Sequence, residues 1–174
     1  MLNIGRMAPG RADYYLTAVA RGDDGVEGYY LAHGEEPGRW LGHGAEQLGL
    51  SGEVTAEQLR AVLDARHPDA GVQLARHPAR KVPGFDHTFR APKSVSLLWA
   101  LGDREAAEQV VVAHDAAVDA AIGYLQRTAG FTRRGAGGAE TTPVDGFVAA
   151  AFRHRTSRAD DPLLHTHVLV ANLA

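Results

Sequence analysis

The sequence contains no cysteine, which excludes disulfide bonds and any metal site built on thiolate ligands. A metal ion bound by this chain would therefore need histidine, aspartate or glutamate ligands. The sequence also has no apolar run of about 18 residues, the length that a transmembrane helix requires. Its first 15 residues lack the basic start, apolar stretch and cleavage site of a secretory signal peptide. These absences predict a cytoplasmic protein with no membrane partner.

The sequence also has no excess of positive charge. Its 18 lysine and arginine residues are outnumbered by 21 aspartate and glutamate residues, which gives a net charge of −3. This balance argues against a general nucleic-acid binder. Basic residues nevertheless gather in three short stretches, at 76–81, 133–134 and 153–158. Such patches occur on the solvated surfaces of many proteins, and they would also suit a protein that binds one particular nucleic-acid sequence. Composition alone leaves both interpretations open.

The pattern of apolar residues predicts an α+β fold in a single domain. The chain has 174 residues, 45% of them hydrophobic, which is enough for one core. Alternating apolar and polar residues predict strands at 1–7, 85–89, 147–158 and 163–173. Helical signals predict helices at 11–20, 55–67, from Pro92 onward and at 103–128, and the glycine-rich segment 132–143 is expected to be a loop. This order predicts an antiparallel sheet with helices packed on one face.

The helix expected after residue 54 has the clearest start signal. Thr55 and Gln58 lie three residues apart and match a capping box. Leu59, Val62 and Leu63 then recur at helical spacing and would form its apolar face. The segment His67-Pro68 is expected to end this helix.

Three histidines near the end of the chain form the clearest candidate site. His165 and His167 are two residues apart on a predicted strand, so their side chains would share one face. His154 lies on the preceding predicted strand, and antiparallel pairing would bring it alongside them. Three imidazoles leave coordination positions open, as in catalytic metal sites. Two unrelated surface histidines are the alternative for a bare His-x-His. Imidazoles suit Zn, Ni, Cu or Mn, and a phosphate substrate would add oxygen ligands compatible with Mg.

Four of the five tyrosines form two adjacent pairs near the start of the chain, Tyr14 with Tyr15 and Tyr29 with Tyr30. A phenol with a pKa of about 10 is a poor nucleophile, so an attacking tyrosine needs a base or a cation nearby. Asp86, on the polar face of its predicted strand, is the candidate helper. It could take the phenolic proton or orient a histidine. The alternative to a catalytic role is that Asp86 is an exposed strand residue and that the tyrosines lie on the surface of a helix.

Three separated blocks of the sequence resemble the relaxase domain of TrwC/TraI-type (MobF) conjugative relaxases, members of the HUH endonuclease superfamily. The block GFDHTFRAPKSVSLL at 84–98 is similar to that family's GxDLTFSAPKSVSLL, and FRHRTSRADDPLLHTHVLVANL at 152–173 is similar to its FRHxTSRxxDPQLHTHxxxxN. The order of tyrosine pairs, tryptophan and glycines in 1–54 also fits. The resemblance covers nearly the whole chain, with the blocks in the expected order.

The resemblance implies a ferredoxin-like antiparallel sheet with helices packed on its faces, the HUH endonuclease fold. It further implies that a tyrosine nicks one DNA strand at a plasmid transfer origin, leaving a 5′ phosphate on the protein and a free 3′ hydroxyl. Carried over by position, the metal ligands are His154, His165 and His167. The catalytic residues are Tyr14 as first nucleophile, Tyr29 for the second strand transfer and Asp86 as helper, with Tyr15 and Tyr30 as companions.

The same resemblance implies partners and a cofactor. The cofactor is a divalent metal ion, Mg or Mn in function, with Zn, Ni or Cu as alternatives. The partners are single-stranded DNA at the transfer origin, accessory relaxosome proteins and a helicase domain outside residues 1–174. Candidate DNA contacts are Lys93, Arg153, Arg155 and Arg158. Lys93 begins a predicted helix, whose N-terminal amides could also meet a phosphate.

The sequence departs from the family pattern in three places. His87 stands where the family has an apolar residue and points to the core side of its strand. The insert between the two tyrosine pairs is longer than expected. The chain also ends at the last predicted sheet strand, so we expect residues 1–174 to be a relaxase domain truncated at its C-terminal end.

Two other functions compete with this one. A rolling-circle replication initiator or transposase would use the same chemistry, but in replication initiators the tyrosine follows the histidines, whereas here it precedes them. A DNA- or metal-binding remnant without catalysis would keep the histidines and form no covalent bond to DNA.

Overall fold

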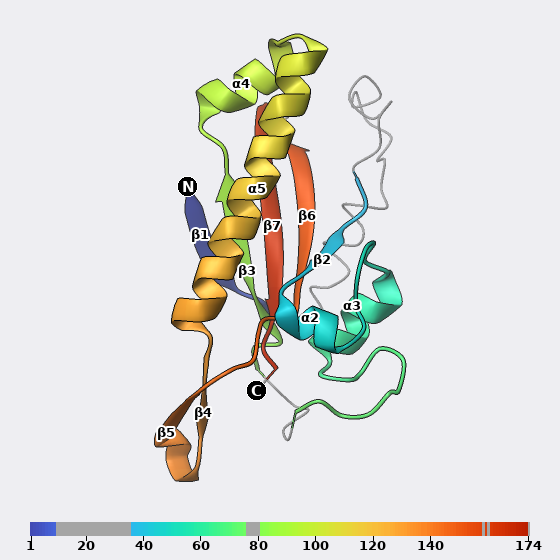
Figure 1. Ribbon diagram of the computed structural model, residues 1–174, viewed down its shortest axis with the longest axis vertical. Coiled ribbons are helices and arrows are strands. Elements are labelled where there is room, and N and C mark those ends of the chain that lie inside the picture. The colour runs from blue at the N-terminus through green and yellow to red at the C-terminus, as the bar shows by residue number, and fades with distance from the viewer. Residues whose placement is uncertain (10–35, 76–80, 158, 160, 174) are drawn as a thin grey trace.

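A computed structural model describes residues 1–9, 36–75, 81–157, 159 and 161–173. Its centre is a five-stranded sheet with the order β1-β3-β7-β6-β2, in which every neighbouring pair is antiparallel (Figure 1). The strands are β1 (Leu2–Arg6), β2 (Arg39–Leu41), β3 (Gly84–Arg90), β6 (Ala149–Thr156) and β7 (Pro162–Ala171). The two tyrosine pairs, Arg158 and the helix expected at 11–20 lie outside the described residues.

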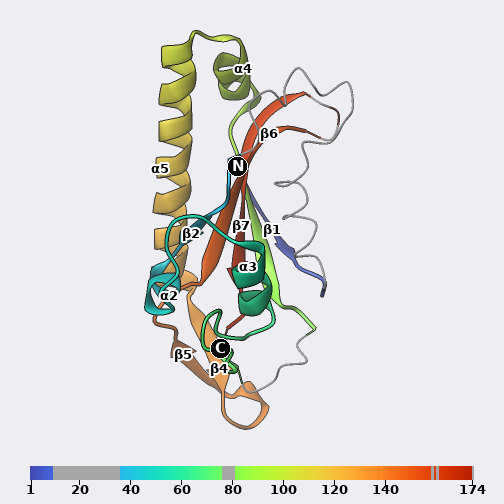
Figure 2. The same cartoon turned by 90° about the vertical axis from the view of Figure 1, so that its right-hand side faces the viewer.

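Helices cover both faces of the sheet. The long helix α5 (Arg104–Ala129) runs along one face and α3 (Ala56–Leu63) lies against the other (Figure 2). The core beneath α5 contains Val118, Ile122, Ala149, Ala151, Val168 and Val170. The core beneath α3 contains Leu59, Val62, Ala150, Phe152 and Leu169. Helices on both faces agree with what the family resemblance implies, whereas the expectation from the residue pattern, helices on one face only, is wrong because β6 and β7 bury alternate residues on both sides.

The expected strand-to-helix sequence in the middle of the chain is confirmed. Strand β3 is followed by α4 (Lys93–Leu101), with Pro92 as its N-cap residue. Helix α5 begins where Asp103 accepts a hydrogen bond from the backbone of Ala106 at 2.8 Å. A short helix, α2 (His43–Gln47), connects the edge strand β2 to the segment before α3. None of the helices in the described ranges combines the length and the hydropathy of a membrane-spanning segment.

Helix α3 begins as predicted but ends earlier. Its N-cap is Thr55, and the capping box with Gln58 is present in both directions. The helix stops at Leu63 instead of near His67, because Ala65 adopts a left-handed conformation with φ of 57°. The amides of Ala65 and Arg66 then donate to the last turn in a Schellman pattern. Glycine usually marks this position, so the alanine concealed the helix end.

The segment expected to be a loop at 132–143 is a β-hairpin, so that expectation is wrong. Strands β4 (Phe131–Arg134) and β5 (Glu140–Pro143) pair antiparallel and project from the end of the molecule where α5 stops (Figure 1). The glycines lie in the connecting turn, where Gly135 and Gly137 have positive φ angles of 77° and 68°. The glycine cluster therefore marks the tip of a hairpin instead of an unstructured connection.

Candidate metal centre

The structure brings His154, His165 and His167 together on the face of the sheet opposite α5. His154 and His165 are direct partners in the β6–β7 ladder, and His167 lies two residues further along β7. The three ring centroids are 5.2 to 5.3 Å apart. Along β6 the residues change from buried at 149–152 to partly exposed at 153–156. The histidines therefore lie where the core ends and the strands become accessible to a ligand.

Hydrogen bonds select the tautomer of two of these rings. Nδ1 of His165 donates to the carbonyl oxygen of Leu163 at 2.9 Å. Nδ1 of His167 lies 2.9 Å from both carboxylate oxygens of Asp86, to which it donates. In the neutral imidazole this leaves the lone pair on Nε2 in each case. An imidazole that donates its other N–H to a carboxylate or a backbone carbonyl is typical of metal-binding histidines.

Asp86 reaches His167 from the neighbouring strand. In the β3–β7 register it stands opposite Leu169, on the same face as the histidines, and both the Asp86 and His167 side chains are less than one-fifth exposed. The hydroxyl of Thr88 lies 3.4 Å from Asp86 Oδ1 and 3.4 Å from His167 Nδ1. Of the two roles predicted for Asp86, the geometry is that of orienting a histidine. Its action on a tyrosine proton stays a prediction.

Burial keeps His165 neutral. Loss of hydration is the largest of the effects that lower the pKa of His165 to about 4, with smaller contributions from His154, His167 and Arg90, in spite of the raising effect of the hydrogen bond to Leu163. A histidine must be neutral to bind a metal ion. At neutral pH, His165 is therefore in the protonation state that coordination requires.

The spacing of the rings fits a shared ion. Three imidazoles that bind one ion at about 2.1 Å have ring centroids about 5 Å apart, which agrees with the observed separations. No group of three or more His, Cys, Asp or Glu side chains in the described ranges is already arranged around one coordination point. The rings of His154 and His165 are instead stacked, with an interplanar angle of 25°. Convergence therefore needs ring rotation, and the broad terminal torsion of histidine allows this at low cost.

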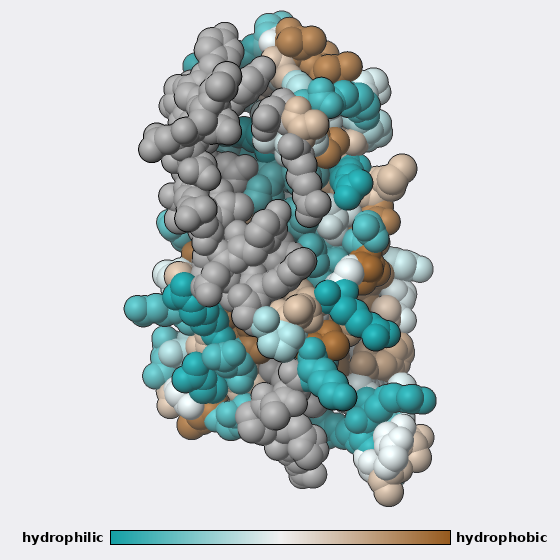
Figure 3. Space-filling model, turned by 180° about the vertical axis from the view of Figure 1, so that it is seen from behind, coloured by the Kyte–Doolittle hydropathy of each residue, from teal (hydrophilic) through white to brown (hydrophobic). Residues whose placement is uncertain are grey.

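The described surface on the side away from α5 is mostly hydrophilic (Figure 3). Seen from behind α5, the described residues show hydrophilic side chains over most of the surface, with hydrophobic ones in small separate groups (Figure 3). A polar surface of this kind suits a charged ligand better than an apolar one.

Comparison with known proteins identifies the family. The family model described as TrwC relaxase matches residues 8–174. The chain belongs to the TrwC relaxase family. The Multifunctional conjugation protein TraI of Escherichia coli is 41% identical over 150 residues, which cover 84% of this chain and 8% of that protein. The same protein from Escherichia coli strain K12 matches equally.

Solved structures of relaxases share the fold. A copper-bound structure of the conjugative relaxase TrwC in complex with oriT DNA superimposes with a TM-score of 0.77 and 33% sequence identity, covering 99% of this chain and 57% of that chain. TrwC complexed with a 27-mer DNA comprising the recognition hairpin and the cleavage site gives a TM-score of 0.72 at 31% identity, covering 99% and 55%. The chain thus spans somewhat over half of these TrwC chains and under a tenth of TraI. The resemblance inferred from the three sequence blocks and the antiparallel fold are confirmed.

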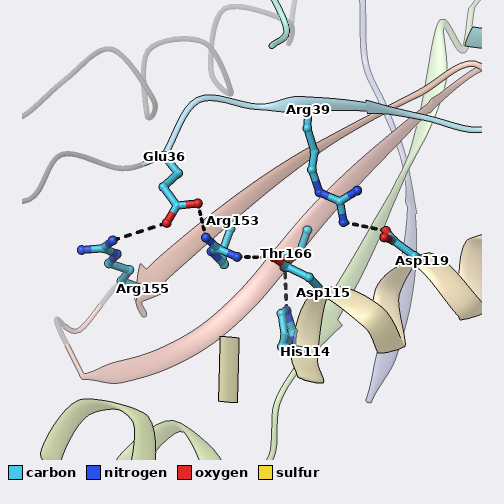
Figure 4. Close-up of polar contacts among 8 residues, drawn as sticks. All are labelled: Glu36, Arg39, His114, Asp115, Asp119, Arg153, Arg155 and Thr166. Carbon is cyan, nitrogen blue, oxygen red and sulfur yellow. Dashed lines mark hydrogen bonds and ion pairs between the residues drawn. The ribbon is translucent and has the colours of Figure 1, made fainter. Parts of the chain in front are cut away.

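Two of the cations suggested as DNA contacts in this TrwC-family chain lie beside carboxylates. Lys93 Nζ is 3.1 Å from the carbonyl oxygen of Pro162 and 3.8 Å from Asp161. Arg153 forms ion pairs with Asp115 and Glu36 on the face covered by α5, opposite the histidines (Figure 4).

The other two suggested cations differ in how far the structure describes them. Arg155 is 4.0 Å from Glu36, and Arg158 lies outside the described residues. Contact of all four cations with DNA stays a prediction. The position of Arg153 indicates a structural contribution in addition.

The sequence did not predict which residues of β3 lie beside the three histidines. Thr88 and Arg90 stand directly opposite His167 and His165 in the β3–β7 register. Nothing in the local pattern pairs them with residues nearly 80 positions away, because the pairing depends on strand register. The alternation that placed Asp86 on the polar face also covered Thr88 and Arg90, so a known register would have identified both.

A separate pocket of about 540 Å³ lies at the C-terminal end of α5, bounded by β3 and the β4–β5 hairpin. Its lining includes His87 but none of the three clustered histidines and not Asp86. As expected from its strand position, His87 points to the core side and is only 8% exposed. The three clustered histidines lie on the opposite face of the sheet from His87, so the chemistry suggested by the cluster is separate from this pocket.

Proposed function

We propose that this chain is the nicking and strand-transfer part of a conjugative relaxase. It would cut single-stranded DNA at a plasmid transfer origin by transesterification to a tyrosine. The observation that carries the proposal is the three-histidine cluster with Asp86 hydrogen-bonded to one of its rings. Family membership supports it, as do two relatives: TrwC is a conjugative relaxase whose structure is in complex with oriT DNA, and TraI is a multifunctional conjugation protein.

The residues of this chain would divide the reaction between them. His154, His165 and His167 would hold a divalent ion, which supplies charge stabilisation to the scissile phosphate when bound. Asp86 would keep His167 in the tautomer that presents Nε2. The phenolic oxygen of Tyr14 would form a bond to phosphorus as the bond to the 3′ oxygen breaks. The products are a 5′ phosphotyrosine and a free 3′ hydroxyl.

The second transfer would use the same site. The phosphotyrosine bond retains the energy of the phosphodiester, so a 3′ hydroxyl can attack it and restore the DNA strand without a nucleotide cofactor. Tyr29 would serve this second strand-transfer step, with Tyr15 and Tyr30 as companions. Copper-bound and metal-bound TrwC structures support a divalent metal cofactor. For this chain we propose Mg or Mn, with accessory relaxosome proteins and a helicase part as partners.

A covalent-adduct assay tests the function directly. The 174-residue chain is incubated with Mn²⁺ and a labelled single-stranded oligonucleotide that contains a conjugative transfer origin. We expect a protein–DNA adduct that survives denaturing electrophoresis and is lost in Tyr14→Phe. The matched control is Tyr124→Phe, which changes a tyrosine that lies 60% exposed on α5 and should leave the adduct unchanged.

The assay also separates the competing functions. A chain that binds Mn²⁺ and DNA but forms no adduct would be a binding module without catalysis. An adduct retained in Tyr14→Phe would refute the assignment of Tyr14 as the first nucleophile.

A further inference from the structure

The back of the histidine site is held by polar contacts from α5. Thr166 lies between His165 and His167 on β7, so its side chain points to the opposite face, where it is only 2% exposed. There its hydroxyl lies 2.9 Å from Nε2 of His114 in α5 (Figure 4). The residue between two of the clustered histidines is therefore attached to the helix behind the sheet.

The neighbouring strand is held by the next residue of the same helix. Arg153 directly precedes His154 on β6 and points to the α5 face, where its side chain is 12% exposed. Its guanidinium lies 2.5 Å from Asp115 Oδ2 and also pairs with Glu36 (Figure 4). A charge-assisted contact of a largely buried arginine fixes the backbone more firmly than an exposed ion pair does.

These two attachments meet at one rung of the sheet. Arg153 and Thr166 are direct partners in the β6–β7 ladder, and the next rung pairs His154 with His165. The ladder then shifts register between His154 and Thr156. His154 and His165 thus occupy the last regular rung before an irregularity, where the ladder alone restrains the backbone least.

We propose that His114 and Asp115 of α5 are positioning residues of the three-histidine site. By holding Thr166 and Arg153 from behind, they set the separation and twist of β6 and β7 at the rung that presents the imidazoles. The consequence is that the three rings stay at 5.2 to 5.3 Å before an ion arrives, so less ordering is needed on binding. This role rests on the proposed metal-binding function, but neither His114 nor Asp115 touches the metal or the DNA in it.

A second aspartate of α5 provides a matched control for the positioning role of Asp115. Asp119 lies one turn beyond Asp115 and pairs with Arg39 of β2 at 2.5 Å (Figure 4). The chemistry of the contact is the same, an aspartate of α5 with an arginine of the sheet. Strand β2 carries none of the three histidines, and both side chains of this pair are at least 36% exposed. Loss of this pair should change stability without changing the site.

The test measures metal affinity and stability in parallel on the 174-residue chain. The variants are Thr166→Val, Thr166→Ser, His114→Gln, Asp115→Asn and Asp119→Asn. Each is titrated calorimetrically with Mn²⁺ and with Zn²⁺, and its thermal unfolding is followed with a chelator present. The visible spectrum of bound Co²⁺ adds a readout of ligand number and geometry.

We expect Thr166→Val and Asp115→Asn to weaken metal binding about 10-fold, in the range typical of residues that support ligands indirectly. Their Co²⁺ spectra should change as well. Thr166→Ser keeps the hydroxyl and should bind metal with wild-type affinity. The metal affinity of His114→Gln should lie between that of Thr166→Val and that of the wild type. Asp119→Asn should bind metal within about twofold of wild type even if its unfolding temperature drops equally.

Two results would overturn the positioning role. The first is wild-type metal affinity in both Thr166→Val and Asp115→Asn. The second is that Asp119→Asn loses as much metal affinity as Thr166→Val and Asp115→Asn when all three are equally destabilised. If Asp115→Asn does not fold, the two variants of Thr166 decide the question alone, because serine keeps the hydroxyl that contacts His114 and valine replaces it with a methyl group. Absence of metal binding in the wild-type chain would instead refute the proposed metal site, and the positioning role with it.

Discussion

At the scale of single residues, the contact between Asp86 and His167 connects two parts of the sequence that share no local pattern. The carboxylate faces Nδ1 of the imidazole at 2.9 Å through both oxygens. Its negative charge favours the tautomer with the proton on Nδ1 and makes Nε2 a better donor to a cation. The residue earlier considered as a helper of tyrosine thus has a defined partner within the histidine cluster.

A substitution of this carboxylate should weaken metal binding. In Asp86→Asn the side-chain oxygen can still accept one hydrogen bond, but the charge is lost, so we expect affinity for Mn²⁺ to fall about 10- to 100-fold. Isothermal titration measures this, with Asp69→Asn, at an exposed position before Gly71, as the control. Equal affinity in Asp86→Asn and wild type would show that the aspartate does not act through His167.

At the scale of elements, the two ends of α3 show what local sequence can and cannot predict. The capping box of Thr55 and Gln58 is a local signal, and it forms as expected. The helix end depends on the left-handed Ala65, whose side chain is fully buried beneath the surrounding structure. Tertiary packing holds alanine in a conformation that isolated residues avoid, so no sequence signal marked it.

Removal of the cap should destabilise the protein by a predictable amount. Thr55→Ala deletes the oxygen that accepts from the Gln58 amide at 3.2 Å, so we expect the free energy of unfolding to fall by about 1 kcal/mol. Urea denaturation measures the change. Thr55→Ser retains the oxygen and should remain close to wild type, and a serine variant as unstable as the alanine variant would contradict the capping explanation.

The same distinction between local and distant signals explains which other features could be predicted from the sequence and which could not. Strands β6 and β7 and the shared face of the histidines follow from a period of two, so they were predicted. The hairpin at 131–143 was missed because its glycines are concentrated in the turn. The partners of Arg153 come from α5 and from Glu36, which lie 38 and 117 residues away in the sequence, where no periodicity could reveal them.

At the scale of the whole molecule, two histidines away from the cluster couple the fold to pH. Burial lowers the pKa of His87 and of His114 below the ordinary value, in spite of the raising effect of the adjacent Asp86 and Asp115. Among the described residues, His87 Nδ1 is buried without a hydrogen-bond partner. Both side chains are therefore neutral in the folded protein at neutral pH, and protonation is easier in the unfolded chain.

Stability should accordingly decrease in mild acid. Because the folded-state pKa values are lowered, the unfolded state binds more protons below a pH of about 6.5, and the free energy of unfolding falls as the pH drops from there toward the folded-state values. Urea denaturation in the presence of a chelator, at about one pH unit above and about one pH unit below the ordinary histidine pKa of about 6.5, checks this. In His87→Leu the difference between the two conditions should shrink. An unchanged difference would show that His87 does not contribute.

The histidine cluster also has a kinetic consequence. All three rings come from residues 154–167, on two strands that are consecutive in the chain, whereas Asp86 is 81 residues from His167. A hairpin of neighbouring strands forms within about 1–10 μs, long before distant segments meet. The three rings can therefore come together early in folding, while the carboxylate that orients one of them arrives only when β3 inserts beside β7. Assembly of the site thus has a built-in order, with the imidazoles first and their orienting charge last.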